Sequence, residues 1–402
     1  MKKVLFFAAA MFMLAACSEE SPFTDVSADL NSQISTVQQA GGSFNFSIES
    51  NEQWTISTDG QEWYGFSQTE GSSSATVTVT VDENYSIKPR TAEFSISTAT
   101  VNKSYVITQA GATVAVTVGD LVIEEIYYAK TIDSTTGKTA NTAQDQYVKI
   151  TNTTDHVVYA DRLALVESFI NSSMDVDMVS YDPDVRPEQS PVDFVFMIAG
   201  DGDDHPLAAG ESIIIAAGAQ RYEIGDKVLD LSAADFEWYD NSTNENYVDV
   251  DNPEITNLDI WYTYSLTVTS LHQQGFKSYA IAYIPQDIDA VAYVENYKWI
   301  GTVYEDWSEY GLGVFEEAIE KAYLIPNEWV VDAVNVSHPE DFTTLPFHSS
   351  LDAGYAYCGA TNTLADRGSK AIVRKRDASG KLIDTNNSTN DFNHGATPSL
   401  LK

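Results

Sequence analysis

Short runs of alternating apolar and polar residues are the feature that most restricts what this chain can fold into. Apolar side chains recur at every second position in four such runs, at residues 43–48, 76–81, 94–97 and 105–107. A two-residue period places alternate side chains on opposite faces of a strand, and Gly, Asn and Ser separate the runs as turn residues do. The pattern predicts an antiparallel β-sandwich in this part of the chain.

Composition narrows the class of protein further. The chain has 402 residues, of which 43 % are hydrophobic, which is enough to build sizeable cores and excludes bulk disorder. Its 22 Lys and Arg stand against 59 Asp and Glu, giving a formal net charge of −37. Because so acidic a surface repels phosphate backbones, we exclude nucleic acid as a partner.

The first twenty residues predict export and an anchor. Lys2 and Lys3 precede the apolar run 4–14, which is too short to span a bilayer and is typical of a secretion signal. The run ends in Leu-Ala-Ala-Cys17, which resembles a bacterial lipobox. We therefore expect a signal peptide over 1–16 and a tether over 17–26 that is held in outer-membrane lipid through acylated Cys17. The alternative is an ordinary signal peptide with an incidental cysteine.

The tether itself carries a hint about location. Ser18-Glu19-Glu20 resembles the surface-export signal of Bacteroidetes lipoproteins, which implies a lipid-anchored protein exposed on the cell surface. The alternative is a solvated acidic tether. With Cys17 lipidated, Cys358 has no disulfide partner, so we expect it to be a small buried hydrophobe.

Several landmarks between residues 27 and 111 occur in a familiar order. Gly41-Gly42 precedes the first alternating strand, Trp54 and Trp63 follow, the turn 71–74 opens a Thr/Val strand, and Thr-Gln-Ala-Gly closes the segment at 108–111. This segment resembles the BACON domain, with Tyr64 departing mildly from the family pattern. The resemblance implies either carbohydrate binding or a stiff spacer. We expect Trp54 and Trp63 to be core residues, because a Trp in an alternating strand is usually buried.

The second region, residues 114–402, carries a different resemblance. Its strand-and-turn segment 147–155 (Tyr-Val-Lys-Ile-Thr-Asn-Thr-Thr-Asp) and its tail 384–392 resemble a lamin-tail-like domain of unknown function in Bacteroidetes outer-membrane lipoproteins. The resemblance implies an immunoglobulin-type sandwich and a link to TonB-dependent transport. The expected fold class is therefore mostly β, with two immunoglobulin-like antiparallel sandwiches in tandem.

The middle of this region departs from a plain lamin tail. We predict a mixed α+β insertion over about 222–345. Segments 261–268 and 278–284 are predicted as strands. Segment 314–323 is predicted as a short helix, because its apolar residues would share one helical face.

Motifs that would indicate an enzyme are missing from the sequence. It has no H-E-x-x-H, no G-x-S-x-G and no P-loop, and its six histidines are scattered. We therefore predict that the chain is not an enzyme, with no catalytic residues, no metal site and no cofactor. The acidic segments 201–204 and 249–252 leave a weak structural calcium site as the alternative to solvated loops.

Four aromatic residues form the candidate ligand site. Trp299, Tyr304, Trp307 and Tyr310 lie within twelve residues and alternate with acidic and small polar residues. Sugars stack on aromatic rings while neighbouring carboxylates bind their hydroxyls, so the cluster could bind a glycan. Packing of the insertion onto the sandwich and a protein interface are the alternatives.

These observations predict a non-enzymatic surface lipoprotein that serves nutrient capture beside a TonB-dependent outer-membrane transporter. One alternative is a protein that binds carbohydrate directly through the 299–310 aromatics. Another is a structural or adhesion protein of the envelope.

Overall fold

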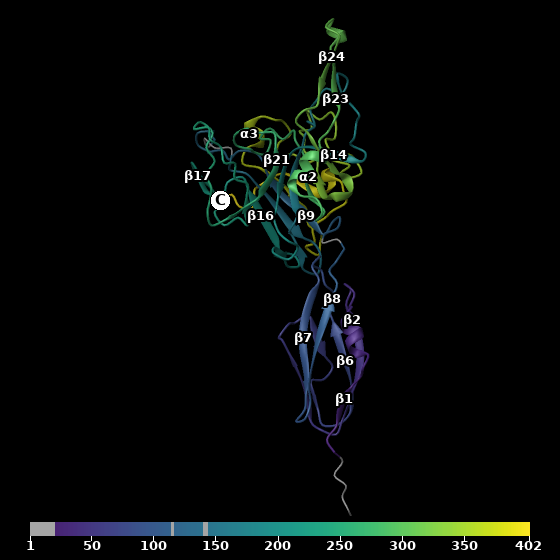
Figure 1. Ribbon diagram of the computed structural model, residues 1–402. Coiled ribbons are helices and arrows are strands. Elements are labelled where there is room, and N and C mark those ends of the chain that lie inside the picture. The colour runs from purple at the N-terminus through teal and green to yellow at the C-terminus, as the bar shows by residue number, and fades with distance from the viewer. Residues whose placement is uncertain (1–20, 114–115, 140–143) are drawn as a thin grey trace, which may run out of the picture. The chain divides into compact units, whose positions relative to one another are not determined.

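Antiparallel strands dominate the computed structural model, which describes residues 21–113, 116–139 and 144–402 (Figure 1). The prediction of a mostly β fold is confirmed. The described residues form two units: 21–84 with 89–111, and 85–88 with 112–113, 116–139 and 144–402. Cys17 and the predicted signal peptide lie outside the described residues. Within the described ranges, no helix has the length and apolar character needed to cross a membrane.

The first unit is a sandwich of two four-stranded antiparallel sheets. Its strands are β1 (Thr24–Val26), β2 (Gly42–Ser50), β3 (Trp54–Thr58), β4 (Tyr64–Phe66), β5 (Glu70–Gly71), β6 (Ala75–Val81), β7 (Arg90–Ser97) and β8 (Asn102–Gln109), with one helix, α1 (Leu30–Ile34). One sheet has the order β1-β2-β6-β4 and the other β5-β3-β7-β8.

The alternation seen in the sequence becomes the division between core and surface. In β6, Val77, Val79 and Val81 are buried, whereas Thr78 and Thr80 between them face outward. Burying one such side chain contributes about 1.5–3 kcal/mol, and slipping the strand by one residue would expose all three valines. The pattern therefore determines the register as well as the fold.

The tryptophans and the glycine turn that marked this unit in the sequence contribute to the packing of its core. Trp54 is buried in the core and its indole N–H donates to the carbonyl of Ser73 (2.9 Å). Gly71 lies against the Trp54 ring, where a larger side chain would clash. Trp63 packs on the edge of the same core, with the Arg90 guanidinium 4.3 Å from its ring centre. The expectation that both tryptophans serve packing agrees with these contacts.

The second unit is a larger sandwich with several short additional sheets. Its strands are β9 (Leu121–Tyr127), β10 (Tyr147–Asn152), β11 (Val158–Tyr159), β12 (Leu163–Ser168), β13 (Val179–Asp182), β14 (Gln189–Met197), β15 (Pro206–Leu207), β16 (Ser212–Ala216), β17 (Arg221–Ile224), β18 (Lys227–Asp230), β19 (Phe236–Glu237), β20 (Thr256–Asn257), β21 (Asp259–Thr263), β22 (Tyr279–Tyr283), β23 (Thr302–Asp306), β24 (Val314–Ala318), β25 (Tyr323–Pro326), β26 (Val330–Val334), β27 (Ala371–Arg374) and β28 (Phe392–Ala396). Its helices are α2 (Ala290–Asn296), α3 (Leu364–Arg367) and α4 (Ser388–Asp391), and its 3-10 turns are η1 (Ser308–Tyr310) and η2 (Asn327–Trp329).

Two main sheets enclose the core of this unit. One has the order β20-β19-β16-β10-β9-β27-β28, and the other has the order β21-β14-β12-β22-β26, with β25 also paired to β14. The core between them contains Ile123, Ile150, Leu165, Phe194 and Ile281 from five strands of the two sheets. A second cluster covers the outer face of the β12 sheet, so these strands are buried on both sides.

Residues 222–345 are part of this sandwich rather than an addition to it. Strands β21, β22 and β26 all lie in that stretch and belong to the second main sheet. The strand predicted at 278–284 is found as β22, and the one predicted at 261–268 is shorter and shifted, as β21. Helix α2 was not predicted, although its N-cap Asp289 accepts a hydrogen bond from the Ala292 amide as an N-cap should.

Candidate functional site

The four aromatic residues of the candidate site separate in the structure. Trp299 is only 1 % exposed and packs against Ile170, Ile319 and Leu324. Its ring centre lies 5.9 Å from that of Phe169. A ring in such a position has no face for a ligand, so for Trp299 the packing interpretation holds and the residue leaves the candidate site.

The other three residues lie on a hairpin that extends from the second unit (Figure 1). Strand β23 carries Tyr304 and pairs with β13 on one side and β24 on the other. The turn η1 joins β23 to β24, and the Trp307 amide donates to the carbonyl of Gly313 (2.8 Å) to close it. Gly311 (φ 75°) and Gly313 (φ 85°) adopt the left-handed conformations that this turn requires.

The end of the hairpin exposes several large apolar side chains. We call this group the tip patch, and its members are 36–67 % exposed: Trp307, Tyr310, Leu312, Val314 and Phe315. The rings of Trp307 and Tyr310 lie 5.8 Å apart at 55°. Soluble proteins seldom leave so many large apolar side chains together in water, and such groups typically mark binding surfaces.

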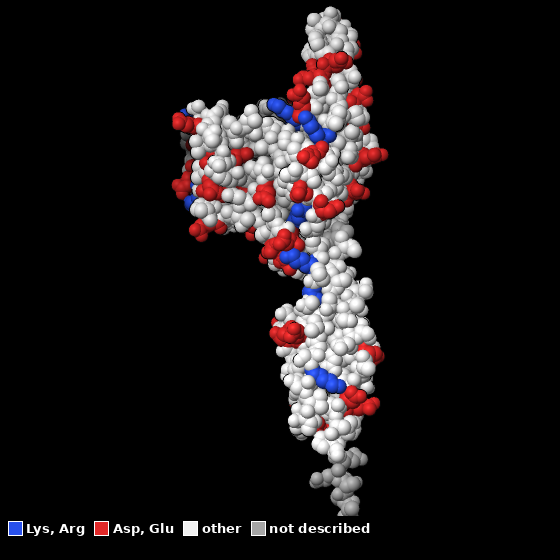
Figure 2. All heavy atoms as spheres, viewed as in Figure 1, with Lys and Arg blue, Asp and Glu red and all other residues white. Residues whose placement is uncertain are grey.

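Acidic residues surround the tip patch. We call them the acidic belt: Glu305, Asp306, Glu309, Glu316 and Glu317. All are exposed, and no Lys or Arg occurs between residues 302 and 318. Figure 2 shows the end of the hairpin without charge and acidic side chains directly beneath it. The indole N–H of Trp307 donates to Glu305 (3.1 Å), which orients the ring. Hydrogen bonds from Ser308 lower the pKa of Asp306.

Sequence reasoning missed three members of the patch. Leu312, Val314 and Phe315 received no functional role, because 314–323 was predicted to be a helix whose apolar residues, Phe315 among them, share one face. That prediction is wrong: residues 314–318 form β24, whose five residues are all exposed. Pairing with β23 overrides the local helical spacing, since Glu305 lies opposite Phe315 and Asp306 opposite Val314. Gly311 and Gly313 were the available turn signal.

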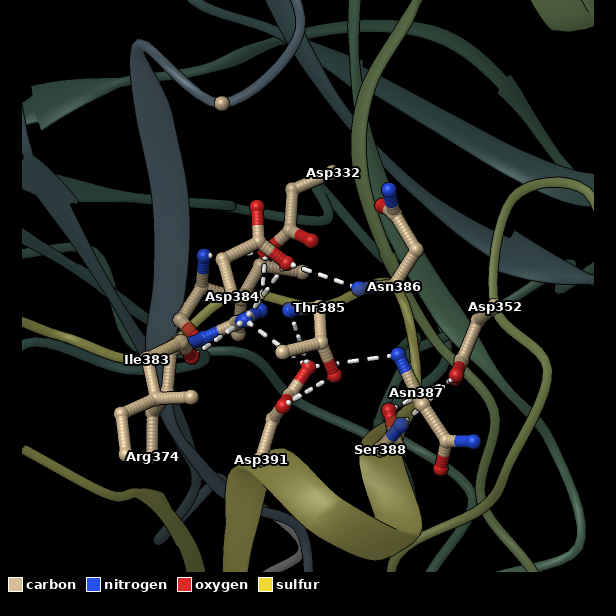
Figure 3. A network of polar contacts seen from close by, with 12 residues as sticks. Asp332, Asp352, Arg374, Ile383, Asp384, Thr385, Asn386, Asn387, Ser388 and Asp391 are labelled. Carbon is tan, nitrogen blue, oxygen red and sulfur yellow. Dashed lines mark hydrogen bonds and ion pairs between the residues drawn. The ribbon is translucent and has the colours of Figure 1, made fainter.

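The tail motif 384–392, by contrast, is built into a buried ion network (Figure 3). The Arg374 guanidinium lies 2.5 Å from Asp332 and 3.1 Å from Asp384, and it donates to the carbonyl of Ile123 (2.8 Å). Asp391 accepts hydrogen bonds from Thr385 and lies 3.9 Å from the same guanidinium. These carboxylates therefore have partners within the domain, which indicates a structural role for the motif.

The other candidates from the sequence, the acidic loops 201–204 and 249–252 and the cysteine Cys358, make contacts within the fold. Within the described ranges, no group of three or more His, Cys, Asp or Glu could hold a metal ion. In the loop 201–204, Asp204 accepts from the Asp201 amide, and in 249–252 Asp249 accepts from the Asp240 amide. Burial raises the pKa of the Cys358 thiol to about 12, which matches its expected role as a hydrophobe.

Two segments of the chain match the models of known families. Residues 51–110 match the model of the BACON family, described as "Putative binding domain, N-terminal". Residues 208–399 match the model of DUF4876, described as "Protein of unknown function (DUF4876)". No curated protein matches the chain. The second match agrees with the predicted domain of unknown function.

The chain is also similar to solved structures. A DUF4876 family protein from Bacteroides thetaiotaomicron VPI-5482 aligns with a TM-score of 0.53 at 19 % identity, over 90 % of this chain and 95 % of that one. A Bacteroides ovatus GH5 xyloglucanase in complex with a heptasaccharide aligns over 29 % of this chain and 23 % of that one, at 22 % identity, and its TM-score of 0.20 carries no argument. The two families indicate a surface-type binding protein of Bacteroidetes. The chain carries a BACON domain at its N-terminal end, followed by a DUF4876 domain.

Proposed function

We propose that this protein is a non-enzymatic, lipid-anchored component of nutrient capture that docks through its tip patch on a TonB-dependent outer-membrane transporter. The observation that carries the proposal is the group of five exposed apolar side chains at the end of the β23–β24 hairpin. Export and anchoring rest on the lipobox-like ending at Cys17 and on the acidic residues after it.

The composition of the tip patch favours a protein partner over a sugar. Sugar sites combine a flat ring with hydrogen-bonding groups, whereas Leu312 and Val314 offer only aliphatic surface. The Trp307 N–H is already engaged by Glu305. Trp and Tyr are also the side chains that most often dominate protein interfaces, where removing one costs about 2 kcal/mol or more.

The acidic belt specifies what the partner surface must look like. A surface that receives the tip patch meets five carboxylates around it, so it requires an apolar depression with Lys or Arg at its edge. The same charges oppose contact with an anionic membrane surface. A lipid anchor at Cys17 would confine both proteins to one membrane and raise their effective concentration.

Affinity purification tests this proposal. The tagged full-length protein is purified from gently solubilised outer membrane, and co-purifying proteins are identified by mass spectrometry. We expect a TonB-dependent receptor in stoichiometric amount. The triple variant Trp307→Ser/Tyr310→Ser/Phe315→Ser should lose it. Leu266→Ser, which changes a 95 % exposed apolar residue outside the hairpin, should retain it.

Other outcomes would contradict the proposal. If the wild type purifies alone, or if the triple variant keeps the receptor, the tip patch is not a transporter-docking site. Calorimetric binding of a glycan that Trp307→Ala abolishes would instead establish the carbohydrate-binding alternative. A protein that binds neither partner would leave the structural or adhesion role.

A further inference from the structure

Two buried carboxyl side chains and a mostly buried lysine lie near one end of the second main sheet of the DUF4876 domain. Glu167 is the second-last residue of the central strand β12, Asp193 lies in β14 on one side, and Lys277 lies two residues before the start of β22 on the other. Glu167 is 1 % and Asp193 5 % exposed. The lysine side chain is 15 % exposed. Strands two positions apart lie about 10 Å from one another, so only a long side chain such as lysine can reach across β12.

The lysine amine and the aspartate carboxyl are in contact. Lys277 Nζ lies 2.8 Å from Asp193 Oδ2 and also contacts the carbonyl oxygens of Ser168 (2.9 Å) and Phe169 (2.5 Å). The Phe169 ring centre is 5.5 Å from Nζ, which keeps one side of the amine apolar. Asp193 Oδ1 is buried and has no hydrogen-bond partner among the described residues. One carboxyl oxygen therefore meets the amine, and the other is held by nothing.

Glu167 lies beside this pair in the sheet, because the strand register places it opposite Phe194, next to Asp193, and opposite Tyr279, two residues after Lys277. Its Oε2 accepts from the His272 amide (3.0 Å), and that amide also donates to the Tyr279 hydroxyl (2.8 Å). Burial, together with the nearby charge of Asp193, raises the pKa of Glu167 to about 8. Glu167 is thus a neutral acid near pH 7, able to give and accept a proton inside the domain.

We propose that Lys277 and Asp193 condense to an isopeptide bond within the domain, with Glu167 transferring the protons. The ammonium first passes a proton to the Asp193 carboxylate. The free Nζ then attacks Cγ, the new C–N bond forms, and one C–O bond breaks. Two amine protons leave with that oxygen as water, so the ion pair becomes a neutral amide and one water molecule. No oxidant, reductant or metal is required.

The surroundings favour this reaction over a permanent ion pair. A buried ion pair has a desolvation cost that its mutual attraction offsets only in part, whereas an amide carries no charge. The fold holds the reacting groups at contact distance, which supplies the proximity that such a condensation needs. Arg374 and Asp332 form a still more buried pair, but a guanidinium is permanently protonated and is no nucleophile. The resulting bond would tie β14 to β22 across the central strand.

Peptide mapping of the full-length protein tests the inference. The protein is denatured, digested and analysed by mass spectrometry. We expect one branched peptide that joins the segments containing Asp193 and Lys277 and is lighter by one water than their sum. The pair Lys149–Glu124 (3.2 Å), whose lysine is more exposed, is the internal control and should appear as separate peptides. Separate, unmodified Asp193 and Lys277 peptides in the wild type would overturn the proposal, whatever any variant does.

Two variants test the roles proposed for Lys277 and Glu167 in the condensation. Lys277→Arg keeps the charge but removes the nucleophile, so the branched peptide should be absent. Glu167→Gln keeps the shape but removes the acid, so the two segments should remain unlinked in a protein whose circular dichroism is unchanged. Full linkage in Glu167→Gln would contradict the role of Glu167.

Discussion

The tail segment 384–392 and the hairpin end 307–315 make opposite use of similar material. Both are short and rich in turn-forming residues, both have acidic residues within or directly beside them, and both drew attention in the sequence. In the tail, the carboxylates turn inward and surround Arg374, so each has a partner in the domain. In the hairpin, the carboxylates turn outward around apolar side chains that touch little else.

The difference teaches where function is to be sought in this domain. The segment that most resembled a family signature has its carboxylates paired within the domain. The segment whose structure was partly mispredicted leaves an unsatisfied surface. Exposed apolar side chains become more stable when a binding partner covers them, whereas an ion network whose charges are all paired gains nothing from a partner.

The largest expected effect is a loss of stability when the ion network of the tail segment is broken. Arg374→Ala leaves Asp332 and Asp391 buried without their counter-charge and should lower the free energy of unfolding by about 3–5 kcal/mol. Urea titration, with hydrogen exchange of the β27 amides reporting the DUF4876 domain, measures the loss. Arg376→Ala is the matched control two residues away. Its half-exposed guanidinium pairs with Glu124, and its removal should cost about 1 kcal/mol or less.

A smaller effect concerns the pH dependence of the buried carboxylates. Burial raises the pKa of Asp145 from 3.8 to about 6. Its contribution to stability is complete below pH 4 and is lost as the pH rises through 6, because the unfolded chain ionises there more readily than the folded one. Asp145→Asn should therefore flatten this part of the stability profile and stabilise the domain at pH 7 by up to about 3 kcal/mol.

Asp226 supplies the control of opposite sign for that profile. A hydrogen bond from the Ser134 amide lowers the pKa of its exposed carboxyl. Asp226→Asn should remove a small stabilisation that is present at neutral pH and lost on acidification. If Asp145→Asn and Asp226→Asn shift the profile in the same direction, burial is not the cause of the Asp145 effect.

How much of the fold the sequence could predict depended on whether strands have an exposed face. In β6, one face meets water and the alternation is visible, so the first sandwich follows from the residues alone. In β9, all seven residues are buried, because apolar clusters cover both faces of its sheet. Such a strand shows no period, so the second sandwich was predicted mainly from a family resemblance.

The candidate site was predictable only in part, for a related reason. Trp299 and Trp307 are eight residues apart and both have acidic and aromatic neighbours, so composition cannot tell the buried one from the exposed one. What separates them is non-local: Trp299 meets Ile170 and Leu324, whereas β24 pairs only with the hairpin strand β23. Contacts between segments that are distant in the sequence leave no signal in local residue spacing or composition.

The smallest expected effect on stability comes from the hairpin, where substitution of Trp307 tests whether the tip patch is free of contacts within the fold. Trp307→Ala should change the free energy of unfolding by about 1 kcal/mol or less, because the residue is 36 % exposed and lies at the end of a hairpin outside the two main sheets. Trp299→Ala, the matched control, should cost about 3–5 kcal/mol through the cavity it leaves. Urea titration of both variants gives the two values. A loss above about 1 kcal/mol for Trp307→Ala would mean that the ring already has a partner within the fold, and the tip patch would then lose its reason to bind another protein.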